Sequence, residues 1–135
     1  MEPRYLLDTN ICIYIRKERP EEVLRRFRKL RPGEAVLSVI TYGELLYGAV
    51  KSEQRVTAME RLRELLILLP ALALPETAAE AYGRIRAELE SKGEMIENND
   101  LWIAAHAVAA RLILVTNNER EFRRVRELKV QNWAG

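Results

Sequence analysis

Short apolar runs along this chain alternate with longer segments in which apolar residues recur at helical spacing. The runs at residues 5–7, 35–39 and 112–116 have the length of buried strands, and helical patterns separate them. Alternating strands and helices favour a parallel sheet covered on both faces, because parallel neighbours need a crossover between them. We therefore predict an α/β protein, a three-layer α/β/α sandwich around a parallel, roughly five-stranded sheet.

The same patterns predict the other elements. Weaker strands are expected at residues 72–74 and, at an edge of the sheet, 130–133. We expect helices at residues 10–17, 20–30, 41–51, 52–69, 76–92, 99–111 and 119–128. The helices at 41–51 and 52–69 should project as an arm whose apolar side chains face either the core or a partner. Since no linker or repeat interrupts the pattern, residues 1–135 are expected to form one domain.

The composition is that of a soluble globular protein. Apolar residues make up 48% of the chain and charged residues 31%, which argues against disorder. No apolar run approaches the roughly 20 residues of a membrane-spanning helix, and the start of the chain does not resemble a signal peptide. A single cysteine, Cys12, excludes an internal disulfide. We expect a cytoplasmic protein that has no membrane partner.

Basic residues are concentrated in two segments of the chain, at 16–31 and 120–126. The net charge of only +2 does not by itself indicate a nucleic-acid partner. Most of the basic residues are arginines, whose guanidinium groups pair well with phosphate oxygens. The alternative is that they form Glu–Arg pairs on solvated helix faces, and the sequence leaves both interpretations open.

Polar or acidic residues stand at four places where an apolar run meets a helix start. These places include Asp8, Glu44, Asp100 and Thr116. Strand ends and nearby helix starts converge on one edge of a parallel sheet, so the carboxylates should meet there. Like charges held together are unfavourable unless a cation lies between them. An all-oxygen set prefers Mg²⁺ or Mn²⁺ to zinc, and such a cation supports phosphodiester hydrolysis.

Each acidic candidate also has a purely structural interpretation. Asp8 fits a helix N-cap, and Asp100 fits a favourable charge in the first turn of a helix. Glu44 fits the last position of a capping box that begins at Thr41. Residues 77–80 match the same capping-box pattern.

Further residues beside these places could support the site less directly. Thr116 could hydrogen-bond a phosphate, and Asn118 could cap the following helix or position a water. Glu97 and Glu121 could each add a carboxylate or face the solvent. The lone His106 lies among alanines in the middle of a helix, so we expect a structural role for it.

Taken together, these motifs resemble PIN-domain ribonucleases, and more narrowly the VapC toxins of bacterial and archaeal toxin–antitoxin pairs. The resemblance spans essentially the whole chain and rests on residues 7–12, 42–45, 99–107 and 115–122. It implies an α/β/α sandwich, usually a homodimer, and a Mg²⁺- or Mn²⁺-dependent endoribonuclease. The family's acidic positions fall on Asp8, Glu44 and Asp100. Its less constant fourth position falls on Asn118, with Glu121 nearby.

The resemblance also implies a substrate and a partner. Toxins of this type cut structured RNA, often tRNA, by means of a water that the metal activates, and a small VapB-like antitoxin blocks the acidic groove. Glu97 departs from the family because it stands where a glycine is common, and Asn118 is neutral where some members carry Asp. These departures support the alternative of a catalytically weak or inactive PIN-fold module that binds RNA or a partner.

Overall fold

The computed structural model describes residues 2–134 and contains a five-stranded sheet in which all neighbouring strands are parallel. The strands are β1 (Tyr5–Leu7), β2 (Ala35–Ser38), β3 (Ala71–Leu72), β4 (Ile113–Val115) and β5 (Val130–Gln131). Their order in the sheet is β3-β2-β1-β4-β5, so the chain builds one side from β1 and then returns to build the other. The reversal of strand order lies between β1 and β4, the kind of place where open α/β sheets form their sites.

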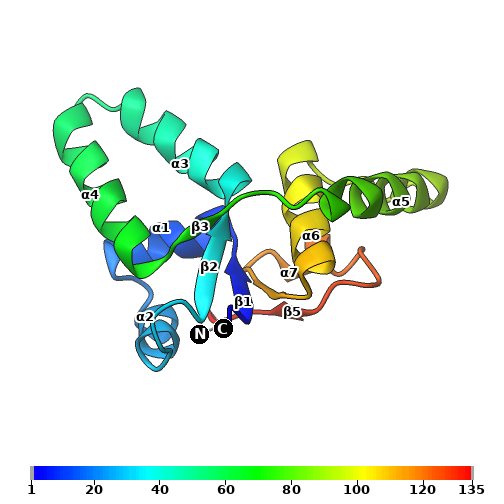
Figure 1. Ribbon diagram of the computed structural model, residues 1–135, viewed down its shortest axis with the longest axis horizontal. Coiled ribbons are helices and arrows are strands. Elements are labelled where there is room, and N and C mark those ends of the chain that lie inside the picture. The colour runs from blue at the N-terminus through cyan, green and yellow to red at the C-terminus, as the bar shows by residue number, and fades with distance from the viewer. Residues whose placement is uncertain (1, 135) are drawn as a thin grey trace.

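Helices cover both faces of this sheet. They are α1 (Thr9–Lys17), α2 (Glu21–Arg28), α3 (Val39–Val50), α4 (Arg55–Leu68), α5 (Thr77–Lys92), α6 (Asn98–Ala110) and the short α7 (Glu119–Phe122). Figure 1 shows α1 to α4 gathered on one side of β1 and β2, with α5 and α6 on the other. This arrangement confirms the predicted α/β fold. Among residues 2–134, no helix is both long and apolar enough to cross a membrane.

Two apolar cores lie on the two faces of the sheet, because successive side chains of a strand point in opposite directions. Tyr5 and Leu7 of β1 join the core that is packed against α1 to α4. Leu6 and, from β4, Leu114 join the core formed with α5 and α6. Full burial of one such leucine stabilises the fold by about 2 kcal/mol. The continuously apolar strands are therefore explained by burial on both faces.

The helix pair α3–α4 projects from the rest of the molecule, as the sequence predicted (Figure 1). Leu62 and Leu65 of α4 are buried in the core, whereas Tyr47 and Val56 are 65% and 74% exposed. The apolar residues of the arm are thus divided between the core and the solvent.

Both predicted capping boxes are wrong. Helix α3 begins at Val39, because the Ser38 side chain at the end of β2 already accepts a hydrogen bond from the Ile40 amide at 3.1 Å. Thr41 therefore lies inside the helix rather than at its cap. Helix α5 begins at Thr77, and Glu76 occupies the cap position without a side-chain hydrogen bond to the helix.

Three other elements near the edges of the sheet differ from the prediction. Strand β3 occupies Ala71–Leu72 rather than residues 72–74, because its partner β2 ends at Ser38, opposite Leu72. Strand β5 ends at Gln131 for the same reason, since β4 ends opposite it at Val115. Helix α7 stops at Phe122, and i to i−3 hydrogen bonds through Val125 lead the chain back to the sheet.

Candidate active site

Asp8 follows β1 directly and begins α1, so it is both a helix cap and a group at the edge of the sheet. Its Oδ1 accepts a hydrogen bond from the Ile11 amide at 3.0 Å, as the cap interpretation predicted. Its Oδ2 accepts a hydrogen bond from the Thr116 hydroxyl at 2.5 Å. Burial raises the pKa of Asp8 to about 6, although both hydrogen bonds lower it and the Glu44 charge raises it. Asp8 is thus a carboxyl group that changes charge just below neutral pH.

Thr116 holds Asp8 in place from the neighbouring strand. It follows β4, whose Val115 carbonyl accepts a hydrogen bond from the Asp8 amide at 3.0 Å. The buried Thr116 hydroxyl donates its single proton to Asp8 and accepts a hydrogen bond from the Asn118 amide at 2.9 Å. In this arrangement Thr116 has no proton left for a phosphate, so it acts as a support for Asp8.

Asp100 lies in the first turn of α6 within a group of acidic side chains. Glu97 caps this helix, and its Oε2 accepts a hydrogen bond from the Asp100 amide at 3.1 Å. The Glu97 amide in turn donates to Glu121 Oε1 at 3.2 Å. The side-chain amide of Asn118 donates to Glu121 Oε2 at 2.5 Å instead of capping α7, so the predicted cap is not formed. Glu97 and Asn118, the two departures from the family pattern, therefore both help to fix the position of Glu121.

The charge environment of Asp100 is unusual for a half-buried carboxyl group. Burial raises its pKa to about 8, and the adjacent Glu121 carboxyl, Glu97 and Asp8 all act in the same direction. Because like charges favour protonation, these surroundings favour the protonated form of Asp100 unless a cation takes the place of the proton.

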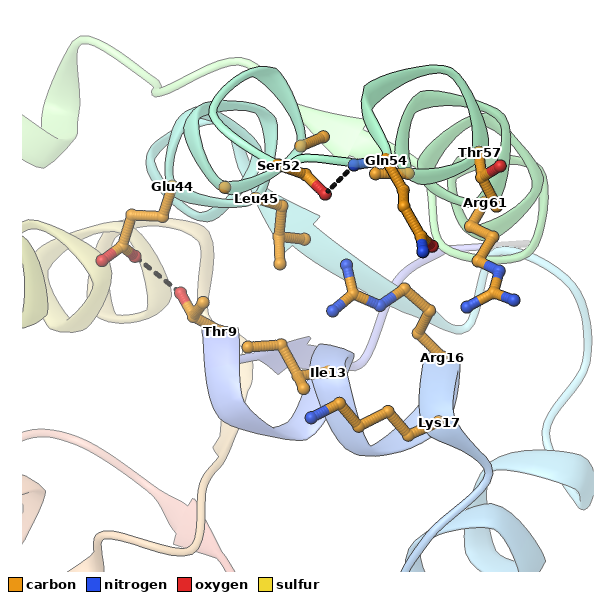
Figure 2. A pocket seen from close by; sticks show the side chains of 13 residues that line it. Thr9, Ile13, Arg16, Lys17, Glu44, Leu45, Ser52, Gln54, Thr57 and Arg61 are labelled. Carbon is orange, nitrogen blue, oxygen red and sulfur yellow. Dashed lines mark hydrogen bonds between the residues drawn. The ribbon is translucent and has the colours of Figure 1, made fainter.

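Glu44 reaches the same region from α3. Its Oε1 accepts a hydrogen bond from the Thr9 hydroxyl at 2.6 Å, and Figure 2 shows this contact between α1 and α3. Thr9 is thus a site residue that the sequence motifs did not predict. The only signal for it was a hydroxyl group directly after Asp8 at a helix start.

His106 lies outside this group of acidic residues. It is buried, and its Nδ1 lies 2.8 Å from Ser38 Oγ, the hydroxyl that caps α3. Burial also lowers the pKa of His106. The predicted structural role is therefore the one that the structure supports.

The donor chemistry of the site fits a hard divalent cation. Asp8 and Asp100 have raised pKa values partly because of neighbouring carboxylates, a repulsion that a bound cation would relieve. Within residues 2–134, no three Asp, Glu, His or Cys side chains are gathered tightly enough to form a closed metal cluster. The carboxylates would therefore have to draw together around the ion.

Comparison with known proteins identifies the family. Residues 5–128 match the PIN domain family. The chain is 45% identical over 131 residues to ribonuclease VapC2 of Haemophilus influenzae, covering 97% of this chain and 98% of that protein. It is 39% identical over 131 residues to the tRNA(fMet)-specific endonuclease VapC of Shigella flexneri, with the same coverage of both chains.

Solved structures give the same result. The VapBC-1 structure from nontypeable Haemophilus influenzae superposes with a TM-score of 0.89 at 38% identity, covering 97% of this chain and 98% of that one. The DNA-bound VapBC structure from Salmonella typhimurium gives a TM-score of 0.90 at 37% identity, with the same coverage of both chains. The fold, the motifs and the relatives agree, and the chain belongs to the PIN-domain family as one of its VapC ribonucleases.

Proposed function

We propose that this chain is a divalent-metal-dependent endoribonuclease and the toxin of a toxin–antitoxin pair. The observation that carries the proposal is that Asp8 and Asp100 converge where the strand order of the sheet reverses. The two residues lie 92 positions apart in the sequence. Burial raises the pKa of both groups; Glu44 adds to the rise for Asp8, and Glu121, Glu97 and Asp8 add to the rise for Asp100. A bound cation would relieve the repulsion between these carboxylates, and a cation held by carboxylates is suited to phosphodiester hydrolysis.

Asp8 and Asp100 would be the main ligands of Mg²⁺ or Mn²⁺, with Glu44 and Glu121 binding directly or through water. When bound, the cation would lower the pKa of a water and neutralise the charge that develops on the scissile phosphate. Thr116 orients the Asp8 carboxylate by donating to Oδ2, and Thr9 orients Glu44 by donating to Oε1. These hydroxyls hold the Asp8 and Glu44 carboxylates in the metal-free protein.

The proposed substrate is structured RNA such as tRNA, because relatives at similar identity are named tRNA(fMet)-specific endonucleases. The proposed partner is a VapB-like antitoxin, since the solved relatives are VapBC complexes. We further propose that the toxin is a homodimer and acts in the cytoplasm, where tRNA is found.

The test is cleavage of purified tRNA in the presence of Mn²⁺ or Mg²⁺. We expect wild-type protein to cleave, and we expect EDTA, Asp8→Asn and Asp100→Asn each to abolish cleavage. Glu60→Gln removes a carboxylate from the exposed surface of α4 and should cleave like wild type. Cleavage that survives both Asp substitutions would disprove the assignment. Binding of tRNA without cleavage in every sample would favour the alternative, a PIN-fold module that binds RNA without cutting it.

A further inference from the structure

We infer that the groove enclosed by α1, α3 and α4 is a subsite for one nucleotide of the RNA, next to the scissile phosphate. This inference rests on the proposed ribonuclease function. The groove has a volume of about 330 Å³, at the lower end of the roughly 300–1,000 Å³ typical of small-ligand sites. Thr9 and Glu44 line one end of it, so a nucleotide bound there would adjoin the candidate active site (Figure 2).

The groove carries three cations at its other end. Arg16 and Lys17 come from α1 and Arg61 from α4, and Figure 2 shows the Arg16 guanidinium directed into the space between the helices. Within residues 2–134, none of the three has a carboxylate partner within 4.0 Å. Uncompensated guanidinium and ammonium groups at the end of the groove away from Glu44 match the phosphate of a nucleotide next to the scissile bond.

The second basic segment of the sequence is used differently. Arg123 pairs with Glu119 at 2.6 Å, Arg126 lies 3.9 Å from Glu88, and Arg124 donates to the Met95 carbonyl at 2.9 Å. These arginines have partners within the fold. The phosphate-binding interpretation is therefore better supported for Arg16, Lys17 and Arg61 than for Arg123, Arg124 and Arg126.

The walls of the groove suit the remainder of a nucleotide. Ile13, which is half-buried on α1, supplies an apolar surface on which a base can lie, and Ser52 and Gln54 supply polar groups at the rim. Arg16, Lys17 and Arg61 also line an adjoining hollow of about 550 Å³ between α1 and α4. The RNA backbone can thus continue past the cations into this second hollow.

Gly48 leaves the groove open. It lies in the last turn of α3, and a Cβ built on it meets no atom within 4 Å. Packing against the protein therefore does not require a glycine at this position. A side chain at this position would enter the groove that Gly48 lines.

The test measures separately how the positive charges of the groove and its open volume contribute to RNA binding. We expect the Asp8→Asn protein to bind RNA without cutting it. In that background, tRNA binding is measured for the double variant Arg16→Gln/Arg61→Gln and, separately, for Gly48→Leu. Matched controls are Arg63→Gln, an exposed arginine on α4 that does not line the groove, and Gly83→Leu, an open glycine within α5. The same substitutions in the wild-type background give kcat/KM for cleavage, and circular dichroism verifies folding.

We expect the double Arg variant to bind tRNA about tenfold more weakly, and its log–log salt slope to fall by about 1.4 for two lost phosphate contacts. Gly48→Leu should weaken binding without changing that slope, and both controls should stay within about twofold of the parent. Equal binding by the groove variants and their controls would overturn the inference even if wild-type protein cleaves RNA. Failure of wild-type cleavage would instead overturn the proposed function, and the binding measurements would still decide the subsite.

Discussion

At the scale of single residues, the raised pKa values of Asp8 and Asp100 decide how the stability of the metal-free protein changes with pH. The pKa of Asp100 is raised to about 8 by burial and by Glu121, and that of Asp8 to about 6, mainly by burial. Both values lie above the ordinary value of 3.8, so the folded protein holds protons that the unfolded chain releases. Without metal, ionisation of the site therefore opposes folding.

The metal-free protein should lose stability as the pH rises. Between the unfolded pKa of 3.8 and the folded pKa of about 8, the folded state binds more protons at Asp100, so the free energy of unfolding falls through this range. Asp100→Asn should remove the part of this fall in the free energy of unfolding that occurs above about pH 6. At pH 8 it should stabilise the protein by on the order of 1 kcal/mol, a value reduced because solvent screens the half-exposed side chain. Urea unfolding in EDTA across this pH range measures the effect, with Glu60→Gln as the control. If the free energy of unfolding of Asp100→Asn depends on pH as that of wild type does, the pKa of Asp100 is not raised in the folded protein.

At the scale of helices and strands, the junction between β2 and α3 ties the two faces of the sheet together. Ser38 ends β2, caps α3 through the Ile40 amide, and lies 2.8 Å from His106 of α6. Helix α3, which carries Glu44, is therefore fixed against α6, which carries Asp100. A single buried hydroxyl aligns two of the acidic groups.

Removing this hydroxyl should weaken the fold. Ser38→Ala takes away a cap and leaves a buried polar nitrogen of His106 without its partner, so we expect a loss of about 1–2 kcal/mol in the free energy of unfolding. Ser91→Ala, an exposed serine on α5, should change it by less than about 0.5 kcal/mol. Urea denaturation at pH 7 distinguishes the two variants. Equal stability of Ser38→Ala and wild type would show that this junction contributes nothing.

At the scale of the whole molecule, both halves of the sheet contribute to the site. Asp8 and Thr116 come from the adjacent strands β1 and β4, while Glu44 and Asp100 come from helices on opposite faces. A cation bound between them would join elements from the entire chain. Its effect should therefore appear in global unfolding.

Saturating Mn²⁺ should raise the unfolding temperature of the whole protein. At a free concentration of about 100 times its Kd, a ligand specific for the folded state adds about 2.7 kcal/mol. Asp8→Asn and Asp100→Asn should lose most of this stabilisation, whereas Glu60→Gln should retain it. Thermal unfolding followed by tryptophan fluorescence measures the shift without any RNA. Equal shifts in all variants would place the cation elsewhere.

Much of this architecture could be predicted, because it follows from local patterns of apolar and polar residues in the sequence. Burial on both faces makes the strands continuously apolar, and Asp8 and Asp100 stand where strand ends and helix starts must converge. The Thr9–Glu44 hydrogen bond could not be predicted, because it depends on how α1 packs against α3. The cap of α3 was also missed, since Ser38 was assigned to the strand and the Thr41 pattern competed with it. Strand ends depended on the partner strand, as β3 shows by stopping where β2 does.

The hydrogen bond between Thr116 and Asp8 has a consequence for synthesis of the protein. It joins residues 108 positions apart, so it cannot form until nearly all of the chain has left the ribosome. Contacts of such sequence separation form late in folding, because the closure of long loops precedes them. An unfinished chain would therefore lack the assembled carboxylates. The carboxylate site would thus be assembled only when synthesis of the molecule is nearly complete.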